Sequence, residues 1–184
     1  MNGKSLLSLT PAEIQRNFSV NLLSHFHILQ AFLPAILDRA EGGTIVTVSS
    51  VLGHLGASHL SDYTAAKAGL MAMHTSLRAE LFSLATSTPG AKQIRTILVK
   101  PGQLSTPLFA GVKTPNSFLG PVVETVLLAR KIVEMIDKGR SGVIAEPLYA
   151  RQIEWLGVLP YGLQSVARWM SGVDKAMSGF AASR

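Results

Sequence analysis

Tyr63 and Lys67 are the two side chains whose types and spacing point most directly to chemistry. They occupy positions i and i+4, so in a helix both lie on one face and the lysine ammonium can approach the phenol. A free tyrosine has a pKa of about 10, too high for ready proton exchange at neutral pH. A nearby positive charge stabilises the phenolate and lowers that pKa. The pair predicts acid/base catalysis by Tyr63, although such pairs also occur by chance on solvated helix faces.

Ser50 and the segment Lys100–Gly102 follow two short β-branched runs that are typical of buried strands. Ser50 comes after the run Thr44–Val48 and stands 63 − 50 = 13 residues before Tyr63; the neighbouring Ser49 is the alternative candidate. In a parallel α/β sheet, ligands bind outside the carboxyl ends of the strands. We therefore expect Ser50, Tyr63 and Lys100–Gly102 to meet at that edge of the sheet.

The order of the predicted elements is that of parallel crossover connections. A capping box at Thr10–Glu13 begins a long helix, and Glu41–Gly43 ends it. Helices and strands then alternate, which indicates an α/β fold with about three parallel strands and helices on both faces. No linker or repeat divides the chain, so we expect a single domain over 1–184. The expected elements are strands at 44–48, 95–99 and 142–145, a helix from about 62 to 84, and a helix that Pro121 opens and Gly139 closes.

The composition fits a globular protein and excludes several functions. Hydrophobic residues make up 47% and charged residues 15% of the chain, which is not a disordered composition. The lack of cysteine excludes disulfides and thiol catalysis and favours a reducing compartment. The net charge of +6 is scattered, so nucleic-acid binding is not expected. The histidines lack metal-ligand spacing, no uninterrupted apolar stretch approaches the ~20 residues of a membrane span, and no signal peptide follows Met1.

Four motifs in order give residues 5–146 a resemblance to the short-chain dehydrogenase/reductase family. They are Ser19–Leu23 in the first helix, Ile45–Ser50 at the first strand, Tyr63–Ala68 in the second helix and Val99–Thr106 at the second strand. The resemblance implies the C-terminal half of a Rossmann-type, doubly wound parallel sheet. It also implies an NAD(P)-dependent oxidoreductase that interconverts a carbonyl and a secondary alcohol.

The resemblance assigns a role to each residue of the site. Tyr63 would be the acid in carbonyl reduction and the base in alcohol oxidation, and Ser50 would hydrogen-bond the substrate oxygen. Lys67 would bind the nicotinamide ribose and lower the pKa of Tyr63, while Asn21 would hold a water that links Lys67 to solvent. The cofactor would be NAD(P), with NADP(H) slightly favoured, and direct hydride transfer implies no metal. The nicotinamide would be lined by Pro101, Gly102, Leu104 and Thr106.

Two motifs of complete family members have no counterpart here. These are the glycine-rich turn T-G-x-x-x-G-x-G, whose backbone amides bind the pyrophosphate, and the segment Asn-Asn-Ala-Gly. We therefore expect a shortened member with little activity alone, in which 1–150 form the catalytic half and 151–184 an amphipathic C-terminal tail. The alternative is a catalytically inert fragment that acts as an interaction or dimerisation module.

The last segments of the chain bear on substrate and partners. Phe109, Val112, Phe118 and Leu119 lie where the family keeps a substrate lid, and they favour a lipophilic small molecule. The stretch 155–170 resembles the tail of membrane-associated retinol and hydroxysteroid dehydrogenases, with an apolar stripe, two tryptophans and basic residues. Packing over the substrate mouth or a partner subunit explains the stripe equally well. We expect an intracellular homodimer, cytoplasmic or peripheral to the endoplasmic reticulum membrane or lipid droplets.

Overall fold

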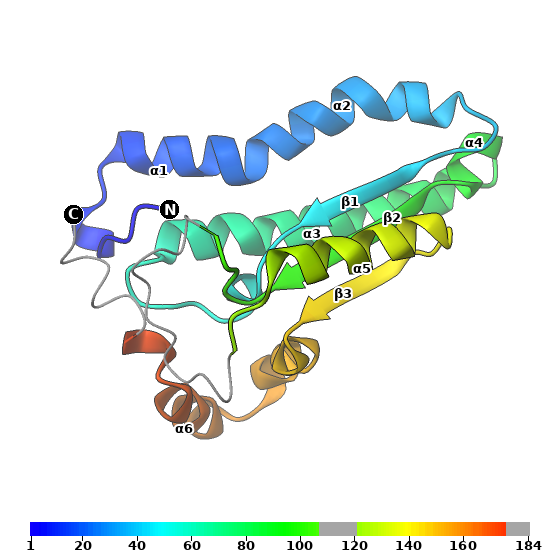
Figure 1. Cartoon of the computed structure of the whole chain (residues 1–184). Coiled ribbons are helices and arrows are strands. Elements are labelled where there is room, and N and C mark those ends of the chain that lie inside the picture. Colours follow the sequence, from blue (N-terminus) through cyan, green and yellow to red (C-terminus); the bar gives the residue numbers. More distant parts are fainter. Residues whose placement is uncertain (107–120, 176–184) are drawn as a thin grey trace.

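A three-stranded parallel sheet in the order β1-β2-β3 forms the centre of the molecule (Figure 1). The computed structural model describes residues 1–106 and 121–175. The strands are β1 Thr44–Val48, β2 Arg95–Pro101 and β3 Gly142–Glu146, which confirms the three predicted strands. In the register, Val48 lies opposite Val99 and Pro101 lies opposite Glu146, so all three carboxyl ends meet at one edge.

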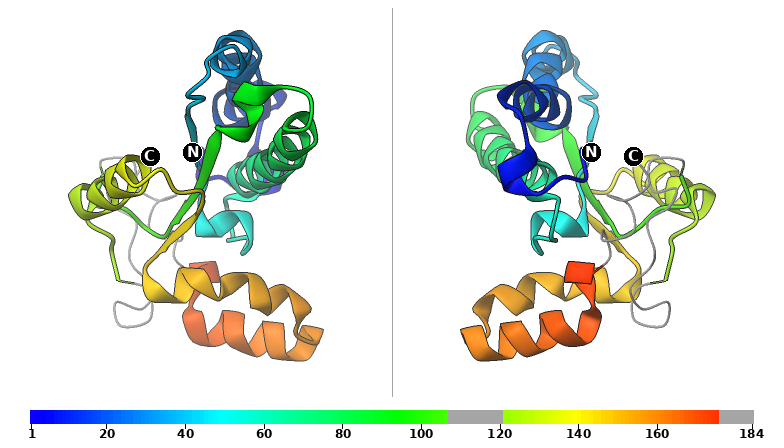
Figure 2. Two further views of the ribbon diagram at one scale, coloured as in Figure 1. Left: turned by 90° about the vertical axis from the view of Figure 1, so that its right-hand side faces the viewer. Right: turned by 90° about the vertical axis from the view of Figure 1, so that its left-hand side faces the viewer.

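Helices cover both faces of the sheet, as the alternating pattern predicts (Figure 2). One face carries the long run made of α1, a π-helical turn η2 and α2, together with α3; the other face carries α5. The bounds are α1 Pro11–Phe18, η2 Ser19–Leu23, α2 Ser24–Leu37, α3 Ser61–Leu84 and α5 Thr125–Asp137. Shorter turns are η1 Leu6–Ser8, η3 Val51–Gly53 and α4 Pro89–Lys92.

Two apolar clusters hold these layers together, one on each face. Between β1 and α3 the buried residues are Ile45, Leu77, Leu81 and Ile94, with Leu29, Leu33, Ile36 and Leu37 of α2 packed against them. Between the sheet and α5 they are Ile97, Val99, Leu128 and Ile144. The alternation along each strand, with period two, assigns successive side chains to opposite clusters.

The helix boundaries follow local chemistry, with two corrections. The first helical run, expected to end at Glu41–Gly43, ends at Leu37 with Asp38 as its C-cap. Thr10 Oγ1 accepts a hydrogen bond from Glu13 N (3.3 Å) and Glu13 Oε2 accepts one from Thr10 N (3.0 Å), which confirms the capping box. The helix expected to open at Pro121 instead begins at Thr125. The reason is that Val123 is extended and forms a parallel bridge with Leu104, so these residues satisfy their backbone groups as a strand would.

The helical run Pro11–Leu37 is long and apolar enough to cross a membrane by length and composition, with a hydropathy of 1.4. We assign it to the globular fold, because Leu29, Leu33 and Leu37 pack against the buried cluster on β1 and α3. The same helix carries Asn21, which the sequence places in the site.

The chain after β3 forms a separate helical layer at the carboxyl edge of the sheet (Figures 1 and 2). Its elements are η5 Leu148–Arg151, η6 Ile153–Val158, α6 Tyr161–Ser171 and η7 Val173–Lys175. Ala150 and Ile153 are buried against Val51 and Ala145, so this layer is anchored on η3 and the end of β3.

Candidate active site

Ser50, Tyr63 and Pro101 come together at the carboxyl edge of β1 and β2. Ser50 Oγ lies 3.5 Å from the carbonyl oxygen of Pro101 and accepts a hydrogen bond from the backbone N–H of Leu52 at 3.2 Å. The hydroxyl of Ser50 also acts on the Tyr63 phenol and favours a lower pKa for it. Ser49 Oγ instead donates to the carbonyl of Lys67 (2.9 Å), so it anchors α3. Of the two candidate serines, Ser50 is therefore the one that faces the phenol.

The phenol of Tyr63 is buried, and its burial governs its acidity. Only 6% of the residue is exposed, and it packs with Leu60 against Leu52, Ala57 and Met1. Burial raises the pKa of Tyr63 above its ordinary value, while the hydrogen bond with Ser50 acts in the opposite direction. The expectation that Lys67 lowers this pKa is wrong, because burial is the largest influence and raises it.

Lys67 lies one helical turn from Tyr63 and faces the same side. Its Nζ is 5.7 Å from the centroid of the Tyr63 ring and donates a hydrogen bond to the carbonyl of Val48 at 3.2 Å. Burial lowers the pKa of the Lys67 ammonium. The predicted pairing on one helix face is confirmed: the ammonium lies over the Tyr63 ring and donates to a strand carbonyl.

Asn21 lies on the π-helical turn η2, which packs against α3, the helix of Lys67. Its Nδ2 donates to the carbonyl of Asn17 (3.1 Å) and to Asn17 Oδ1 (2.5 Å), so the amide group is engaged within its own helix. The charge of Lys67 contributes to lowering the pKa of His25, after burial, which places this helix near the ammonium. A Cβ on Gly69 would lie 3.0 Å from Leu22, so glycine at this position permits the close packing. The helical turn of Asn21 therefore packs against α3, and in the described part of the chain the amide bonds Asn17 rather than Lys67.

The four residues assigned to the nicotinamide are placed in sequence along the edge. Pro101 and Gly102 are buried, and the Gly102 N–H donates to the carbonyl of Glu146 at 2.7 Å. Leu104 forms the bridge with Val123, and Thr106 is half-buried. The predicted lid residues Phe109, Val112, Phe118 and Leu119 lie outside the described residues.

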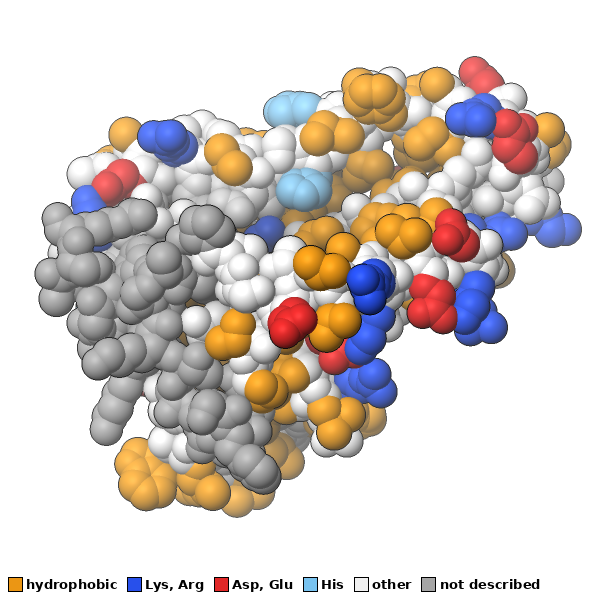
Figure 3. Space-filling view, in the orientation of Figure 1, with side chains coloured by type: hydrophobic (Ala, Val, Ile, Leu, Met, Phe, Trp, Pro, Cys, Tyr) orange, Lys and Arg blue, Asp and Glu red, His pale blue; other side chains and the backbone are white. Residues whose placement is uncertain are grey.

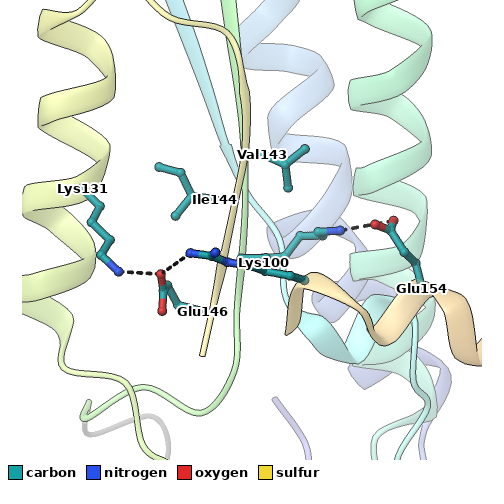
Figure 4. A pocket seen from close by; sticks show the side chains of 8 residues that line it. Lys100, Lys131, Val143, Ile144, Glu146 and Glu154 are labelled. Carbon is teal, nitrogen blue, oxygen red and sulfur yellow. Dashed lines mark hydrogen bonds and ion pairs between the residues drawn. The ribbon is translucent and has the colours of Figure 1, made fainter. Parts of the chain in front are cut away.

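A charged cluster beside this edge has no clear signal in the sequence. The side chain of Lys100 is only 4% exposed, and its Nζ lies 3.3 Å from Glu154 of η6. His54 lies 3.9 Å from the same carboxylate, but burial and the charge of Lys100 lower the pKa of His54, so we treat it as neutral. Figure 4 shows Lys100 reaching Glu154 and, nearby, Lys131 reaching Glu146. A pocket here is lined by Lys100, Lys131, Val143, Ile144, Ala145, Glu146, Arg151 and Glu154.

Asp62, directly before the catalytic candidate, is a second residue that spacing did not single out. It is 5% exposed; its Oδ1 accepts from the Tyr63 N–H at 2.8 Å and its Oδ2 from Asn2 Nδ2 at 2.7 Å. These contacts fix the first turn of α3 and with it the backbone of Tyr63. An acidic residue in the first turn of a helix is the only sequence signal for this role.

A parallel α/β sheet with a buried Tyr–Ser pair and a lysine at its carboxyl edge defines a class of oxidoreductase folds. The family described as short chain dehydrogenase matches residues 1–116. The chain therefore belongs to the short-chain dehydrogenase/reductase family of oxidoreductases, which confirms the resemblance of the four motifs.

Individual relatives support the same assignment. The chain is 35% identical over 161 residues to the uncharacterized oxidoreductase TDA5 of Saccharomyces cerevisiae, covering 88% of this chain and 48% of that protein. It is 37% identical over 131 residues to human 17-beta-hydroxysteroid dehydrogenase 13, covering 71% and 41%. A 3-oxoacyl-[acyl-carrier protein] reductase from Brucella melitensis, crystallised with bound NAD, superimposes with a TM-score of 0.61 at 25% identity, covering 81% and 57%. The chain spans about half the length of the curated relatives it matches.

Proposed function

We propose that this chain provides the catalytic half of an NAD(P)-dependent oxidoreductase that interconverts a carbonyl and a secondary alcohol on a lipophilic small molecule. One observation carries the proposal: a buried tyrosine beside Ser50, with the Lys67 ammonium 5.7 Å from its ring, at the carboxyl edge of a parallel sheet. Family membership and the NAD-bound structural relative support NAD(P) as the cofactor. The relatives are named oxidoreductases, which does not favour the alternative of an inert interaction module.

The residues present fit the nicotinamide end of NAD(P). Tyr63 and Lys67 offer hydroxyl and ammonium donors suited to ribose hydroxyls, and Pro101 and Gly102 form the adjacent edge. A Cβ at Gly102 would lie 2.9 Å from Pro147 Cδ and from Tyr149 Oη, so glycine at this position lets the backbone pack closely against these two residues. Lys67 and Tyr63 would therefore hold the ribose, with Leu104 and Thr106 following along the nicotinamide.

The proton steps are assigned to the chain's own residues. In reduction, Tyr63 donates its phenolic proton to the substrate oxygen as the carbonyl carbon receives hydride; a C–H and an O–H bond form, and the C=O bond becomes a C–O single bond. A bound NAD(P)H supplies the hydride. Ser50 hydrogen-bonds the same oxygen, and the Lys67 charge stabilises the phenolate that is left. Oxidation is the reverse, with the phenolate as base.

The surroundings of the phenol favour a lipophilic substrate. Tyr63 is enclosed by Leu60, Leu52 and Ala57, which offer apolar contacts rather than charged ones. The name of the human relative refers to a hydroxysteroid, a largely apolar secondary alcohol. We therefore expect kcat/KM to rise with the apolar area of the substrate, because burial of that area contributes about 25 cal/mol per Å².

Steady-state assays of the chain with NADH and NADPH, on a homologous series of ketones and secondary alcohols, test the proposal. Tyr63→Phe should lower kcat by roughly 10²–10⁴-fold, because acid/base catalysis contributes that much. Tyr161→Phe, at a position 83% exposed on α6, is the matched control and should retain activity. We expect the higher kcat/KM with NADPH.

A longer chain that contains this sequence, where one is encoded, should be assayed in parallel. Turnover that survives Tyr63→Phe in either chain would contradict the assigned role of the phenol. No turnover of any substrate by either chain would favour the inert module instead.

A further inference from the structure

Helix α6 turns its polar side toward the rest of the molecule and its apolar side outward. Its half-buried side, toward the rest of the molecule, consists of Gln164, Ala167, Arg168 and Ser171. Its outward side consists of Leu163 (55% exposed), Val166 (53%), Trp169 (79%) and Met170 (62%). A surface helix of a soluble protein normally turns its apolar stripe toward the core. We call these four outward residues the outer face of α6.

Polar contacts hold the inner side of this helix in place. Arg168 donates a hydrogen bond to the carbonyl of Gly56 at 2.7 Å and forms an ion pair with Asp174. In the preceding segment, Glu154 pairs with the buried Lys100. Gly56 belongs to the loop that leads from Ser50 to Tyr63, so α6 is attached to the wall of the candidate active site. The apolar stripe is therefore held outward by contacts on the opposite side of the helix.

The outer face lies at the periphery of the molecule. In both views of Figure 2, α6 is the outermost layer below the sheet, and Figure 3 shows hydrophobic side chains gathered along that lower margin. The neighbouring η6 segment also exposes Trp155 (67%) and Val158 (73%). A convex helix that presents a row of large apolar side chains suits a flat apolar medium.

Charge and residue type favour a lipid surface over a protein partner. The outer face of α6 contains no charged side chain, and the two acidic residues of the segment 148–175, Glu154 and Asp174, are both ion-paired. The chain carries a net charge of +6, so long-range attraction is toward anionic surfaces. Tryptophan is the side chain most favoured at the boundary between headgroups and acyl chains.

We propose that α6 binds an anionic lipid surface, with the outer face at the headgroup–acyl boundary and the loop 51–61 held beside it. The binding is independent of the proposed function; the consequence that a lipophilic substrate reaches Tyr63 from the lipid phase rests on that function.

The two tryptophans of the chain, Trp155 and Trp169, make the test direct, because both lie in this region. Vesicles of phosphatidylcholine with phosphatidylserine should shift the tryptophan emission to shorter wavelength and should co-sediment the chain. Vesicles of phosphatidylcholine alone should bind more weakly, and salt should reduce binding to the anionic vesicles. A chain that neither shifts its emission nor pellets with anionic vesicles would overturn the proposal.

A matched pair of variants locates the binding surface. Trp169→Ser combined with Met170→Ser should weaken vesicle binding by about tenfold or more, because two large apolar side chains are lost from the interface. Phe82→Ser removes an aromatic side chain that is 84% exposed on α3 and should leave binding unchanged. Equal losses in both variants would mean general adhesion rather than docking through α6 and would contradict the proposal.

Size-exclusion chromatography of the same proteins shows whether a second copy of the chain, rather than lipid, covers the outer face of α6. If the double variant elutes as a smaller species than the parent chain, the outer face of α6 is covered by a second copy and the lipid proposal fails. Tyr63→Phe should bind vesicles as the parent does, so a failure of the proposed catalysis and a failure of lipid binding are separately visible.

Discussion

At the residue scale, the burial of Tyr63 raises the pKa of its phenol, and the neighbouring side chains must stabilise the phenolate. A buried phenol is harder to ionise, and here burial outweighs the hydrogen bond with Ser50. A buried amine is harder to protonate, and the pKa of Lys67 is lowered for that reason. Burial therefore favours the uncharged form of both side chains.

Replacement of Ser50 by alanine tests the balance around the phenol. The Ser50 hydrogen bond lowers the pKa of Tyr63, so Ser50→Ala should raise that pKa further. The measurement is an ultraviolet titration of phenolate formation in a background of Tyr149→Phe and Tyr161→Phe, where Tyr63 is the one remaining tyrosine. A midpoint that is unchanged or falls in Ser50→Ala would show that the serine does not act on the phenol.

The identities of the site residues were predictable, but the direction of their pKa shifts was not. Spacing along a helix and position after a strand are local properties, and they located Tyr63, Lys67 and Ser50. Burial depends on residues such as Leu52 and Leu60 folding over the phenol, which no spacing rule contains. The amide of Asn21 is engaged by Asn17, four residues earlier in the same helical run.

At the scale of elements, close backbone approach fixes how the helices pack against one another. The junction of α2 and α4 is the tightest instance. A Cβ on Gly90 would lie 2.0 Å from the carbonyl oxygen of Leu37 and 2.9 Å from that of Arg39. Backbone atoms cannot move aside as a side chain can, so this position requires glycine.

Gly90→Ala should therefore destabilise the fold by about 1–3 kcal/mol, the usual cost of overpacking. Urea denaturation followed by circular dichroism measures the change. Gly157→Ala is the matched control, because a Cβ there would meet nothing within 4 Å. Equal stability of the two variants would mean that the α2–α4 junction is not packed as described.

The start of a helix was predictable from sequence where neighbouring residues cap it. It was not predictable where residues far apart in the chain pair with each other. The capping box is predictable because both of its hydrogen bonds join Thr10 and Glu13, which lie within four residues of sequence. The start of α5 does not, because the extended conformation at Val123 arises from its bridge to Leu104. The cluster of Lys100 and Glu154 joins positions 54 apart in the chain, and single-sequence patterns do not report such pairs.

At the scale of the whole molecule, three partly buried histidines make the fold sensitive to acid. Burial lowers the pKa of His25, His54 and His74 below the ordinary value of 6.5. The unfolded chain therefore binds more protons than the folded chain as the pH falls through 6.5. Their contribution to stability is fully present above that pH and is lost below it. The free energy of unfolding should decrease as the pH falls from 7 toward 5, by about 1.4 kcal/mol per pH unit for each histidine that stays neutral in the fold.

His74 offers the sharpest test of this dependence. It is 2% exposed, its Nδ1 lies 2.9 Å from Thr47 Oγ1, and Nε2 has no hydrogen-bond partner in the described part of the chain. His74→Gln should flatten the slope of unfolding free energy against pH. Leu77→Ala, a buried truncation on the same helix, should lower stability at every pH and keep the slope. A slope that His74→Gln leaves unchanged would assign the acid sensitivity to other groups.

The hydrogen bond from Arg168 to Gly56 joins positions 112 apart in the sequence, which gives the molecule an order of assembly. During synthesis the loop before Tyr63 leaves the ribosome long before the helix that fastens it. The candidate active site therefore reaches its final shape last, after β1, β2 and β3 have been synthesised. Nascent chains of which only the residues up to 147 have emerged from the ribosome should consequently show the sheet protected from proteases while residues 51–61 are still cleaved.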